Sequence, residues 1–250
     1  MVITRIQGGL GNQLFQWAHA RALSLKYNIP CYLDIHDVSG GGTHRDFTLD
    51  VFPNLYYELA NINSISNVIV DNFNFSPITM TESEVKNSVI YLNGYWQTEK
   101  YFIEYADIIR NELRSNVKID LGNSTSLHVR RTDYLKSNGF HPVQPIEYYE
   151  KAISLIGDYE RLLVFSDDIQ WCKDNLKFDN MTFIEGYKDY EDIWTMSMCK
   201  NNIIVNSSFS WWGAWLNENP DKKVIAPLNW FGPQSNLNTS DIIPNEWIKI

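Results

Sequence analysis

The sequence predicts an α/β protein made of two Rossmann-like domains whose parallel sheets face a common cleft. Short apolar runs alternate along the chain with segments whose apolar residues recur at helical spacing, which is typical of parallel βαβ units. A polar, glycine-containing segment at residues 118–124 separates two such series. A chain of 250 residues can supply two domains of roughly 120 residues, each with its own core. We therefore expect an N-terminal domain over residues 1–120 and a C-terminal domain over residues 121–250.

The first half opens with an expected strand at residues 2–6 and a helix at residues 12–27. Further strands are expected at residues 32–34, 67–70 and 88–92, and a helix at residues 98–114, while residues 36–87 show little other pattern. The second half is more regular. Its expected strands are residues 126–130, 161–165, 181–184, 202–205 and 223–226, and its helices are residues 146–156, 168–176, 189–200 and 209–218. Five strands joined by four helical crossovers form a doubly wound parallel sheet.

The composition excludes several classes of partner. The formal net charge is -9 and no run of Lys or Arg occurs, so the chain lacks the cationic field that attracts nucleic acid or an anionic membrane surface. Cys31, Cys172 and Cys199 are widely spaced, which indicates neither a zinc site nor a disulfide framework and fits a reducing cytoplasm. No window approaches the ~20 apolar residues that span a bilayer. We expect a cytoplasmic protein without a transmembrane segment, and leave peripheral membrane association open.

Ligands of open α/β sheets bind outside the carboxyl ends of the strands. The strand expected at residues 126–130 runs into the sequence His128-Val129-Arg130-Arg131-Thr132-Asp133. Strand alternation places His128 and Arg130 on one side and Arg131 on the other. Two guanidinium groups at a strand end are suited to neutralising a diphosphate, and pairing with nearby carboxylates is the competing interpretation. The preceding apolar run favours the ligand, because it indicates an interior strand.

Two further strand ends carry polar groups. The strand at residues 161–165 ends in Ser166-Asp167-Asp168, where a carboxylate can accept hydrogen bonds from a guanine edge or cap the following helix, and one aspartate can do each. The strand at residues 202–205 leads into Asn206-Ser207-Ser208-Phe209 at the start of a helix. Hydroxyl groups and free backbone N–H groups at the positive end of a helix suit phosphate, although many such serines are ordinary caps.

In the first half, a glycine-rich segment lies between the first strand and its helix. It reads Gly8-Gly9-Leu10-Gly11-Asn12-Gln13, and glycine there lets a ligand approach the backbone. The pattern is half of a dinucleotide-binding fingerprint, with Asp34 spaced to bind a ribose, but Leu14 stands where the third glycine belongs. An NAD-dependent oxidoreductase is therefore a weaker alternative.

Together these segments resemble the α-1,2-fucosyltransferases of glycosyltransferase family 11. The matching blocks run from Gly8 to Gln13, from Gly94 to Phe102, from His128 to Asp133, from Ser166 to Asp168 and from Asn206 to Leu216. The resemblance implies a GT-B-like architecture and the transfer of L-fucose, with inversion, from GDP-fucose to the 2-hydroxyl of a β-galactoside acceptor. It also implies that His128 and Arg130 meet the nucleotide, with Arg130 on the diphosphate, that Asp168 reads guanine, and that Ser207 and Ser208 hold phosphate.

The resemblance divides the site between the two domains. The N-terminal domain is expected to bind the acceptor and the C-terminal domain the donor. The candidate donor contacts are Gly11, Asn12, His128, Arg130, Ser166, Asp168, Asn206, Ser207, Ser208 and Phe209, and the candidate acceptor contacts are Tyr95, Trp96 and Gln97.

Breaking the fucose C1–O bond places negative charge on the departing diphosphate. The sequence holds no Asp-x-Asp motif for a metal, so Arg130, Arg131 and the serine-bearing helix start are left to stabilise that charge without a cofactor. The acceptor hydroxyl must lose a proton, and Asp133 is expected to take it. Glu185 and His19 compete for that role, and a salt bridge to an arginine is the alternative role of Asp133. A non-catalytic glycan-binding module is the alternative function, but a neutral sugar needs no diphosphate clamp.

Overall fold

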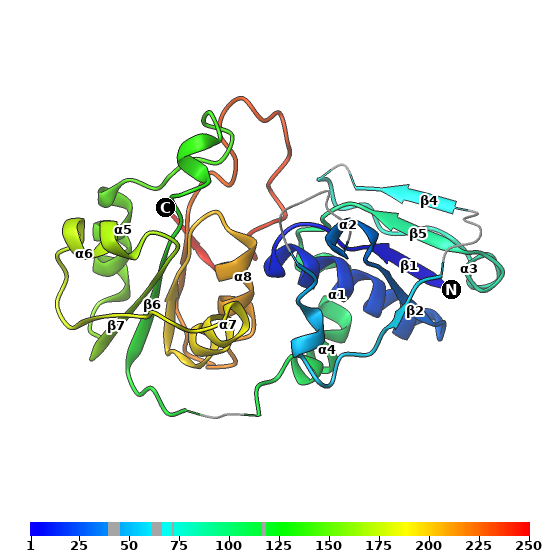
Figure 1. The fold of residues 1–250 in the computed structure, drawn as a ribbon, viewed down its shortest axis with the longest axis horizontal. Coiled ribbons are helices and arrows are strands. Elements are labelled where there is room, and N and C mark those ends of the chain that lie inside the picture. The colour runs from blue at the N-terminus through cyan, green and yellow to red at the C-terminus, as the bar shows by residue number, and fades with distance from the viewer. Residues whose placement is uncertain (40–45, 62–66, 72, 117–118) are drawn as a thin grey trace. The chain divides into compact units, whose positions relative to one another are not determined.

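The structure, a computed structural model, describes residues 1–39, 46–61, 67–71, 73–116 and 119–250 (Figure 1). These residues form two compact units. The first comprises Met1–Ser115 and Ser240–Ile242, and the second comprises Asn116–Thr239 and Ile243–Ile250. Residue 118, at the start of the expected boundary segment, lies outside the described residues. Each unit is built on a sheet whose described strand pairs are all parallel, which confirms the predicted α/β class.

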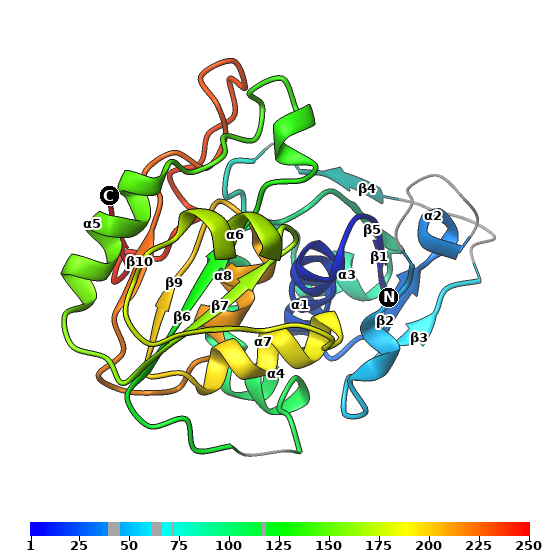
Figure 2. The same ribbon diagram turned by 60° about the vertical axis from the view of Figure 1, so that its left-hand side comes forward.

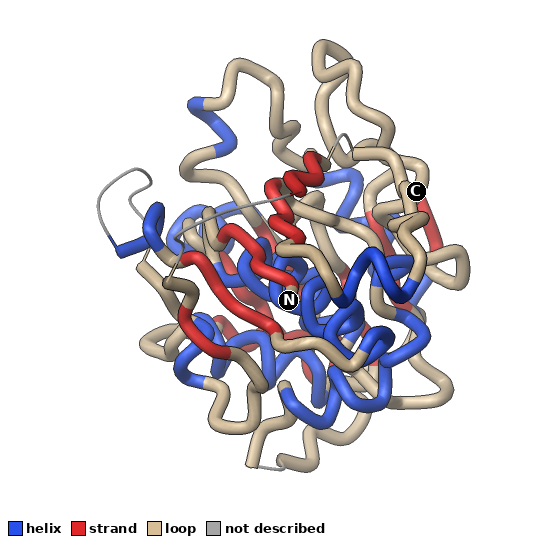
Figure 3. The backbone as a smooth tube through the Cα atoms, turned by 90° about the vertical axis from the view of Figure 1, so that its right-hand side faces the viewer, coloured by secondary structure: helices blue, strands red, loops and turns tan. Residues whose placement is uncertain are grey.

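The first unit has a five-stranded sheet in the order β3-β2-β1-β5-β4. Figure 2 labels these strands, and Figure 3 draws strands in red. Its strands are β1 (Val2–Arg5), β2 (Cys31–Asp34), β3 (Glu58–Leu59), β4 (Asn67–Val70) and β5 (Ile90–Asn93). Its α-helices are α1 (Leu10–Tyr27), α2 (His36–Ser39), α3 (Glu82–Lys86) and α4 (Ala106–Glu112). The sequence pattern did not indicate β3, α2 or α3, because each is too short to show a period.

The helix expected over residues 98–114 is wrong for its first half. The chain there forms two 3₁₀ turns, Glu99–Tyr101 and Ile103–Tyr105, before α4 begins. Phe102 stands between the turns with φ -142° and ψ 2°, outside helical geometry, and its ring is 1% exposed. The chain therefore winds more tightly than an α-helix up to Tyr105, and only the second half of the expected helix is α-helical.

The second unit has a six-stranded sheet in the order β11-β10-β9-β6-β7-β8 (Figure 2). Its strands are β6 (Ser124–Val129), β7 (Arg161–Ser166), β8 (Met181–Phe183), β9 (Asn201–Ile203), β10 (Val224–Ala226) and β11 (Ile248–Lys249). Its α-helices are α5 (Ile146–Ile156), α6 (Ile169–Asn175), α7 (Asp189–Met198) and α8 (Ser208–Trp215). The five predicted strands and four helices are present, and β11 adds an edge strand that the pattern missed.

Side chains of this sheet alternate between two apolar layers. On β7, Leu162 and Val164 pack in the layer that α5 and α6 cover, whereas Leu163 and Phe165 pack with Met196 of α7 on the other face. Helices therefore cover both faces, which is the doubly wound arrangement. No helix in the described ranges has the length and apolar character needed to cross a membrane.

Strand order fixes where a ligand can bind. In the second sheet β6 and β9 are neighbours, but the chain leaves β6 toward β7 and leaves β9 toward β10, on opposite sides. The connections therefore diverge at the carboxyl ends of β6 and β9, the topological switch point at which open α/β sheets bind ligands. In the first sheet the corresponding neighbours are β1 and β5.

Candidate active site

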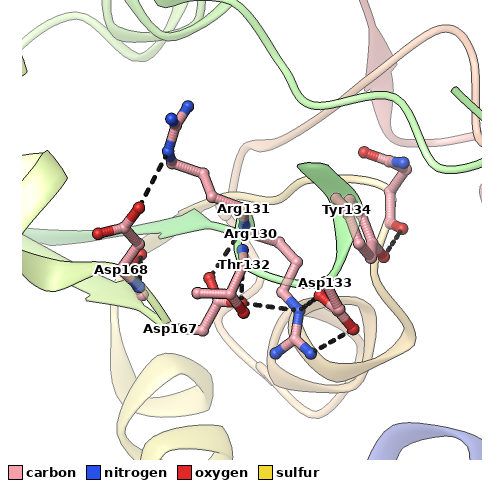
Figure 4. Close-up of polar contacts among 9 residues, drawn as sticks. Arg130, Arg131, Thr132, Asp133, Tyr134, Asp167 and Asp168 are labelled. Carbon is pink, nitrogen blue, oxygen red and sulfur yellow. Dashed lines mark hydrogen bonds and ion pairs between the residues drawn. The ribbon is translucent and has the colours of Figure 1, made fainter. Parts of the chain in front are cut away.

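The loop after β6 presents Arg130 at the switch point of the second sheet (Figure 4). Its Nε and Nη2 atoms donate hydrogen bonds of 2.9 and 2.8 Å to the two carboxylate oxygens of Asp133. Nε also lies 3.2 Å from Oδ2 of Asp167, and the Arg130 side chain is 22% exposed. These two bonds use the Nε and Nη2 edge of the guanidinium group, and Nη1 takes part in neither. The guanidinium group is thus charged, oriented and partly exposed.

Arg131 points to the opposite side of the strand, as the alternation predicts (Figure 4). Its guanidinium carbon lies 3.9 Å from the ring centre of Trp171 on α6, and its Nε lies 3.3 Å from Oδ2 of Asp168. Because the Arg130 and Arg131 side chains point to opposite faces of the strand, they are not placed to bind one diphosphate together. Of the two, Arg130 lies on the same face as His128 and α8.

Asp167 ties the loop after β6 to the end of β7. Its carboxylate accepts hydrogen bonds from the backbone N–H groups of Arg131 and Thr132, at 2.9 and 3.1 Å, and from the Thr132 hydroxyl. With the ion pair to Arg130, this carboxylate fixes the loop that carries both arginines.

Asp168 and Ser166 act locally at the start of α6. Asp168 is the N-cap of that helix and accepts a hydrogen bond from the backbone N–H of Trp171 at 3.3 Å, and the Ser166 hydroxyl accepts from the backbone N–H of Asp168 at 2.9 Å. The capping role that the sequence allowed for one aspartate therefore falls to Asp168.

His128 lies on β6, two residues before Arg130. It is 4% exposed, its ring centre lies 5.5 Å from that of Phe209 on α8, and its Nδ1 has no hydrogen-bond partner in the described part of the chain. Burial and, to a smaller extent, the Arg130 charge lower the pKa of His128 to about 3. The imidazole is therefore neutral at pH 7.

The start of α8 follows β9 at this switch point. Ser207 is the N-cap residue, but its side chain makes no capping hydrogen bond. Asn206 is 2% exposed, and its Nδ2 has no partner among the described residues, although its Oδ1 accepts from Gln144 at 3.0 Å. An uncapped helix start beside an unsatisfied buried amide is a ready site for an anion, and it contrasts with the capped start of α6.

Tyr134 connects the two strand ends and was not singled out by the sequence. Its hydroxyl donates to the backbone oxygen of Asn206 at 2.7 Å, and the guanidinium carbon of Arg130 lies 5.9 Å from its ring centre. Asp167 as the anchor of the loop and Trp171 as the partner of Arg131 were also missed. These roles depend on contacts between strand ends that are far apart in the sequence, so no local signal could have found them.

In the first unit, the glycine-rich segment and the segment after β5 meet at the β1–β5 switch point. Gln97 donates to Oδ1 of Asn12 at 2.8 Å. Gly8 has φ +77°, and a Cβ there would lie 2.7 Å from Nδ2 of Asn12, so this turn requires glycine. Gly11 is buried in the first turn of α1. The structure thus brings Asn12 and Gln97 together.

The other candidates in the first unit have structural surroundings. Trp96 is 2% exposed and packs in the core, while Tyr95 and Gln97 are partly buried. His19 is 2% exposed, with its ring centre 4.7 Å from that of Trp96 and 4.3 Å from that of Tyr101. In the second unit, Glu185 is ion-paired with Lys173 at 2.6 Å.

Burial of His19 predicts a loss of stability in acid. Burial lowers the pKa of His19 to about 3, against about 6.5 when unfolded, so the unfolded state binds more protons between these values and stability falls as the pH drops below 6.5. For one such group the loss of unfolding free energy between pH 7 and pH 4.5 is about 2 to 3 kcal/mol. His19→Phe keeps a ring between its neighbours. Its free energy of unfolding, relative to that of wild type, should therefore be higher at pH 4.5 than at pH 7 by about the same amount. Urea unfolding of both proteins at both pH values measures these free energies. A difference between variant and wild type that is the same at pH 7 and pH 4.5 would contradict the burial of a neutral imidazole.

Two parallel α/β units, with a strand-end arginine and an uncapped helix start at a switch point, fit a glycosyltransferase of the GT-B class. The chain belongs to the Glycosyl transferase family 11, whose model matches residues 76–250. The predicted family and fold are therefore confirmed. No group of three or more His, Cys, Asp or Glu side chains in the described ranges is placed to hold a metal ion.

Two curated proteins of Escherichia coli are similar over nearly their whole length. An α-1,2-colitosyltransferase is 33% identical over 291 residues, covering 100% of this chain and 99% of the relative. The O-antigen biosynthesis glycosyltransferase WbnK is 33% identical over 303 residues, covering 98% and 99%. Among solved structures, the E. coli heptosyltransferase WaaC matches 100% of this chain and 92% of its own with a TM-score of 0.50 at 10% identity, a likeness of fold alone.

Proposed function

We propose that this enzyme is an inverting galactoside 2-α-L-fucosyltransferase that uses GDP-fucose without a metal ion. The observation that carries the proposal is the convergence of Arg130 and the uncapped start of α8 on one switch point, two cationic elements suited to a diphosphate. Family membership favours a transferase over the glycan-binding and NAD-dependent alternatives. The donor sugar is the open point, because one relative is named a colitosyltransferase.

The residues suggest how the charge of the reaction is handled. As the bond between fucose C1 and the β-phosphate oxygen breaks, the electron pair leaves with GDP. Arg130 and the N–H groups of Ser208 and Phe209 stabilise that charge, and Ser207 and Asn206 contribute hydrogen bonds. The neutral His128 donates to the nucleotide from the same face. Arg131 acts from the other face by positioning Asp168. One carboxylate oxygen of Asp168 caps α6 and the other pairs with Arg131, and we assign guanine to the lone pairs that these two contacts leave.

Asp133 connects donor binding to proton removal in this proposal. In the absence of a donor its carboxylate holds Arg130. A diphosphate competes for the same guanidinium and releases Asp133, whose side chain is 52% exposed, to take the proton of the acceptor hydroxyl. The oxygen then bonds to C1 from the side opposite the leaving GDP, which inverts the anomeric centre.

Binding of GDP tests the proposed site directly. GDP at 100 times its Kd should stabilise the fold by about 2.7 kcal/mol, measured as an upward shift of the melting temperature. NAD and a free β-galactoside serve as controls and should give no comparable shift. Stabilisation by NAD, or none by GDP at millimolar concentration, would remove the donor assignment.

We predict that transfer does not require a divalent cation. The prediction follows from the absence of an Asp-x-Asp motif and from the cationic elements at the switch point. Activity in excess EDTA should equal that in Mg²⁺ or Mn²⁺ within about twofold. Loss of activity in EDTA with recovery on adding metal would overturn the assignment of leaving-group stabilisation to Arg130 and α8.

A cytoplasmic location, with peripheral membrane contact left open, is also a proposal. All three cysteines are free and buried, which a reducing compartment favours. Fractionation of cells, with detection of the chain in cytosolic and membrane fractions, would locate it.

A further inference from the structure

A cluster of aromatic rings lies beside the Arg130–Asp133 pair on two loops of the second unit. The first loop follows β6 and carries Tyr134, Phe140 and His141, and the second follows β10 and carries Phe231. Both loops rise together at the same end of the unit (Figures 1 and 2). Because both leave the carboxyl ends of their strands, the cluster borders the switch point.

The rings are in mutual contact. The Tyr134 and His141 rings stack at 4.8 Å with an interplanar angle of 16°. The ring centre of Phe231 lies 5.1 Å from that of Phe140 and 5.5 Å from that of His141. Phe140 nevertheless remains 40% exposed, which is unusual for a phenylalanine held in a ring cluster.

The two loops are locked together. The backbone N–H of Gly232 donates to the Phe140 oxygen at 2.9 Å, and a Cβ on Gly232 would lie 1.8 Å from the Gly139 oxygen. Ser137 fixes the first loop by donating to the backbone oxygens of Tyr134 and His141 and by accepting from the His141 N–H at 3.1 Å. The cluster is therefore a preformed surface rather than a set of independent side chains.

His141 gives this apolar surface hydrogen-bonding capacity. Its Nδ1 is shielded from solvent and has no partner in the part of the chain that the structure describes, so Nε2 is the nitrogen that can face a bound hydroxyl. Burial lowers the pKa of His141, the nearby Asp133 acts in the opposite sense, and Arg130 lowers it further. The imidazole is thus neutral at pH 7 and can exchange a hydrogen bond with a hydroxyl group.

We infer that Phe140, His141 and Phe231 form the acceptor subsite, with the apolar face of the acceptor pyranose against the phenylalanine rings and one of its hydroxyls on His141. The inference rests on the proposed function and names where its second substrate binds. A pyranose has C–H faces and a hydroxyl rim, which match ring faces beside a neutral imidazole. Tyr134 lies under His141 and within 5.9 Å of the Arg130 guanidinium carbon, so this surface adjoins the group assigned to the diphosphate.

Steady-state kinetics with each substrate varied separately test the subsite. Phe140→Ala and Phe231→Ala should each raise the KM for the galactoside about 2- to 10-fold, the worth of a ring contact, and leave the KM for GDP-fucose unchanged. His141→Gln should also raise the acceptor KM, whereas Phe140→Tyr, which keeps the ring, should stay within about twofold of wild type. Tyr187→Ala removes an aromatic residue that is 61% exposed on the same unit and is the control, with both KM values unchanged.

Stabilisation by GDP shows that each variant is folded, and Phe140→Leu replaces any Phe140→Ala protein that fails this check. An unchanged acceptor KM in both phenylalanine variants, or equal rises for donor and acceptor, would overturn the subsite while the wild type still transfers fucose. Absence of transfer by the wild type itself would instead reject the proposed function.

Discussion

Arg130→Lys should reduce kcat by a factor of about 10² to 10³, although it keeps the positive charge. Lysine cannot reproduce the planar fork with which Arg130 engages Asp133 through one edge and, in our proposal, the diphosphate through the rest. Initial rates at saturating GDP-fucose and acceptor measure the effect.

The adjacent arginine is the matched control. Arg131→Lys alters a side chain of the same type one position along, but on the face of Trp171 and Asp168, and should lose much less activity. A near-normal kcat and donor KM for Arg130→Lys, or equal losses for both variants, would remove Arg130 from its assigned role.

Asp133→Asn separates two roles of one carboxylate. If Asp133 takes the acceptor proton, the variant should lower kcat by a factor on the order of 10² to 10⁴ while leaving the affinity for GDP nearly unchanged. The reason is that the diphosphate displaces Asp133 from Arg130, so the carboxylate is not needed to hold the bound donor. Titration with GDP and rates at saturating donor give the two quantities.

A collapse of GDP affinity together with kcat would show that Asp133 serves only to orient Arg130. The proton would then have to go elsewhere. Glu185 is paired with Lys173, and His19 is buried among aromatic rings, so neither is placed for the task. His141 would become the next residue to test.

The sequence predicted the interior strands that bury most of their side chains. The strands at 126–130 and 161–165 lie within two residues of β6 and β7, because their apolar runs are long enough to show an interior strand. The edge strands β3 and β11 have two exposed residues each and carry no such signal. The helix expected from residue 98 begins only at Ala106, because two 3₁₀ turns on either side of Phe102 occupy its first half.

The site was predictable where it depends on strand alternation and strand ends. Alternation correctly separated His128 and Arg130 from Arg131, and the rule for carboxyl ends located Asp168 and Ser207 on the correct edge of the sheet. Hydrogen-bond partners were not predictable. Asp167 reaches a loop 35 to 37 residues away, and His141 joins its cluster through the packing of two loops.

We propose that this chain moves fucose from GDP-fucose to the 2-hydroxyl of a galactose. Incubation of the enzyme with GDP-fucose and a panel of β-galactosides, followed by mass spectrometry and NMR of the products, tests this activity. We expect a product that carries one added fucosyl residue, α-linked at the 2-hydroxyl of galactose. Failure to transfer fucose to any galactoside, or transfer only from another donor such as GDP-linked colitose, would contradict it.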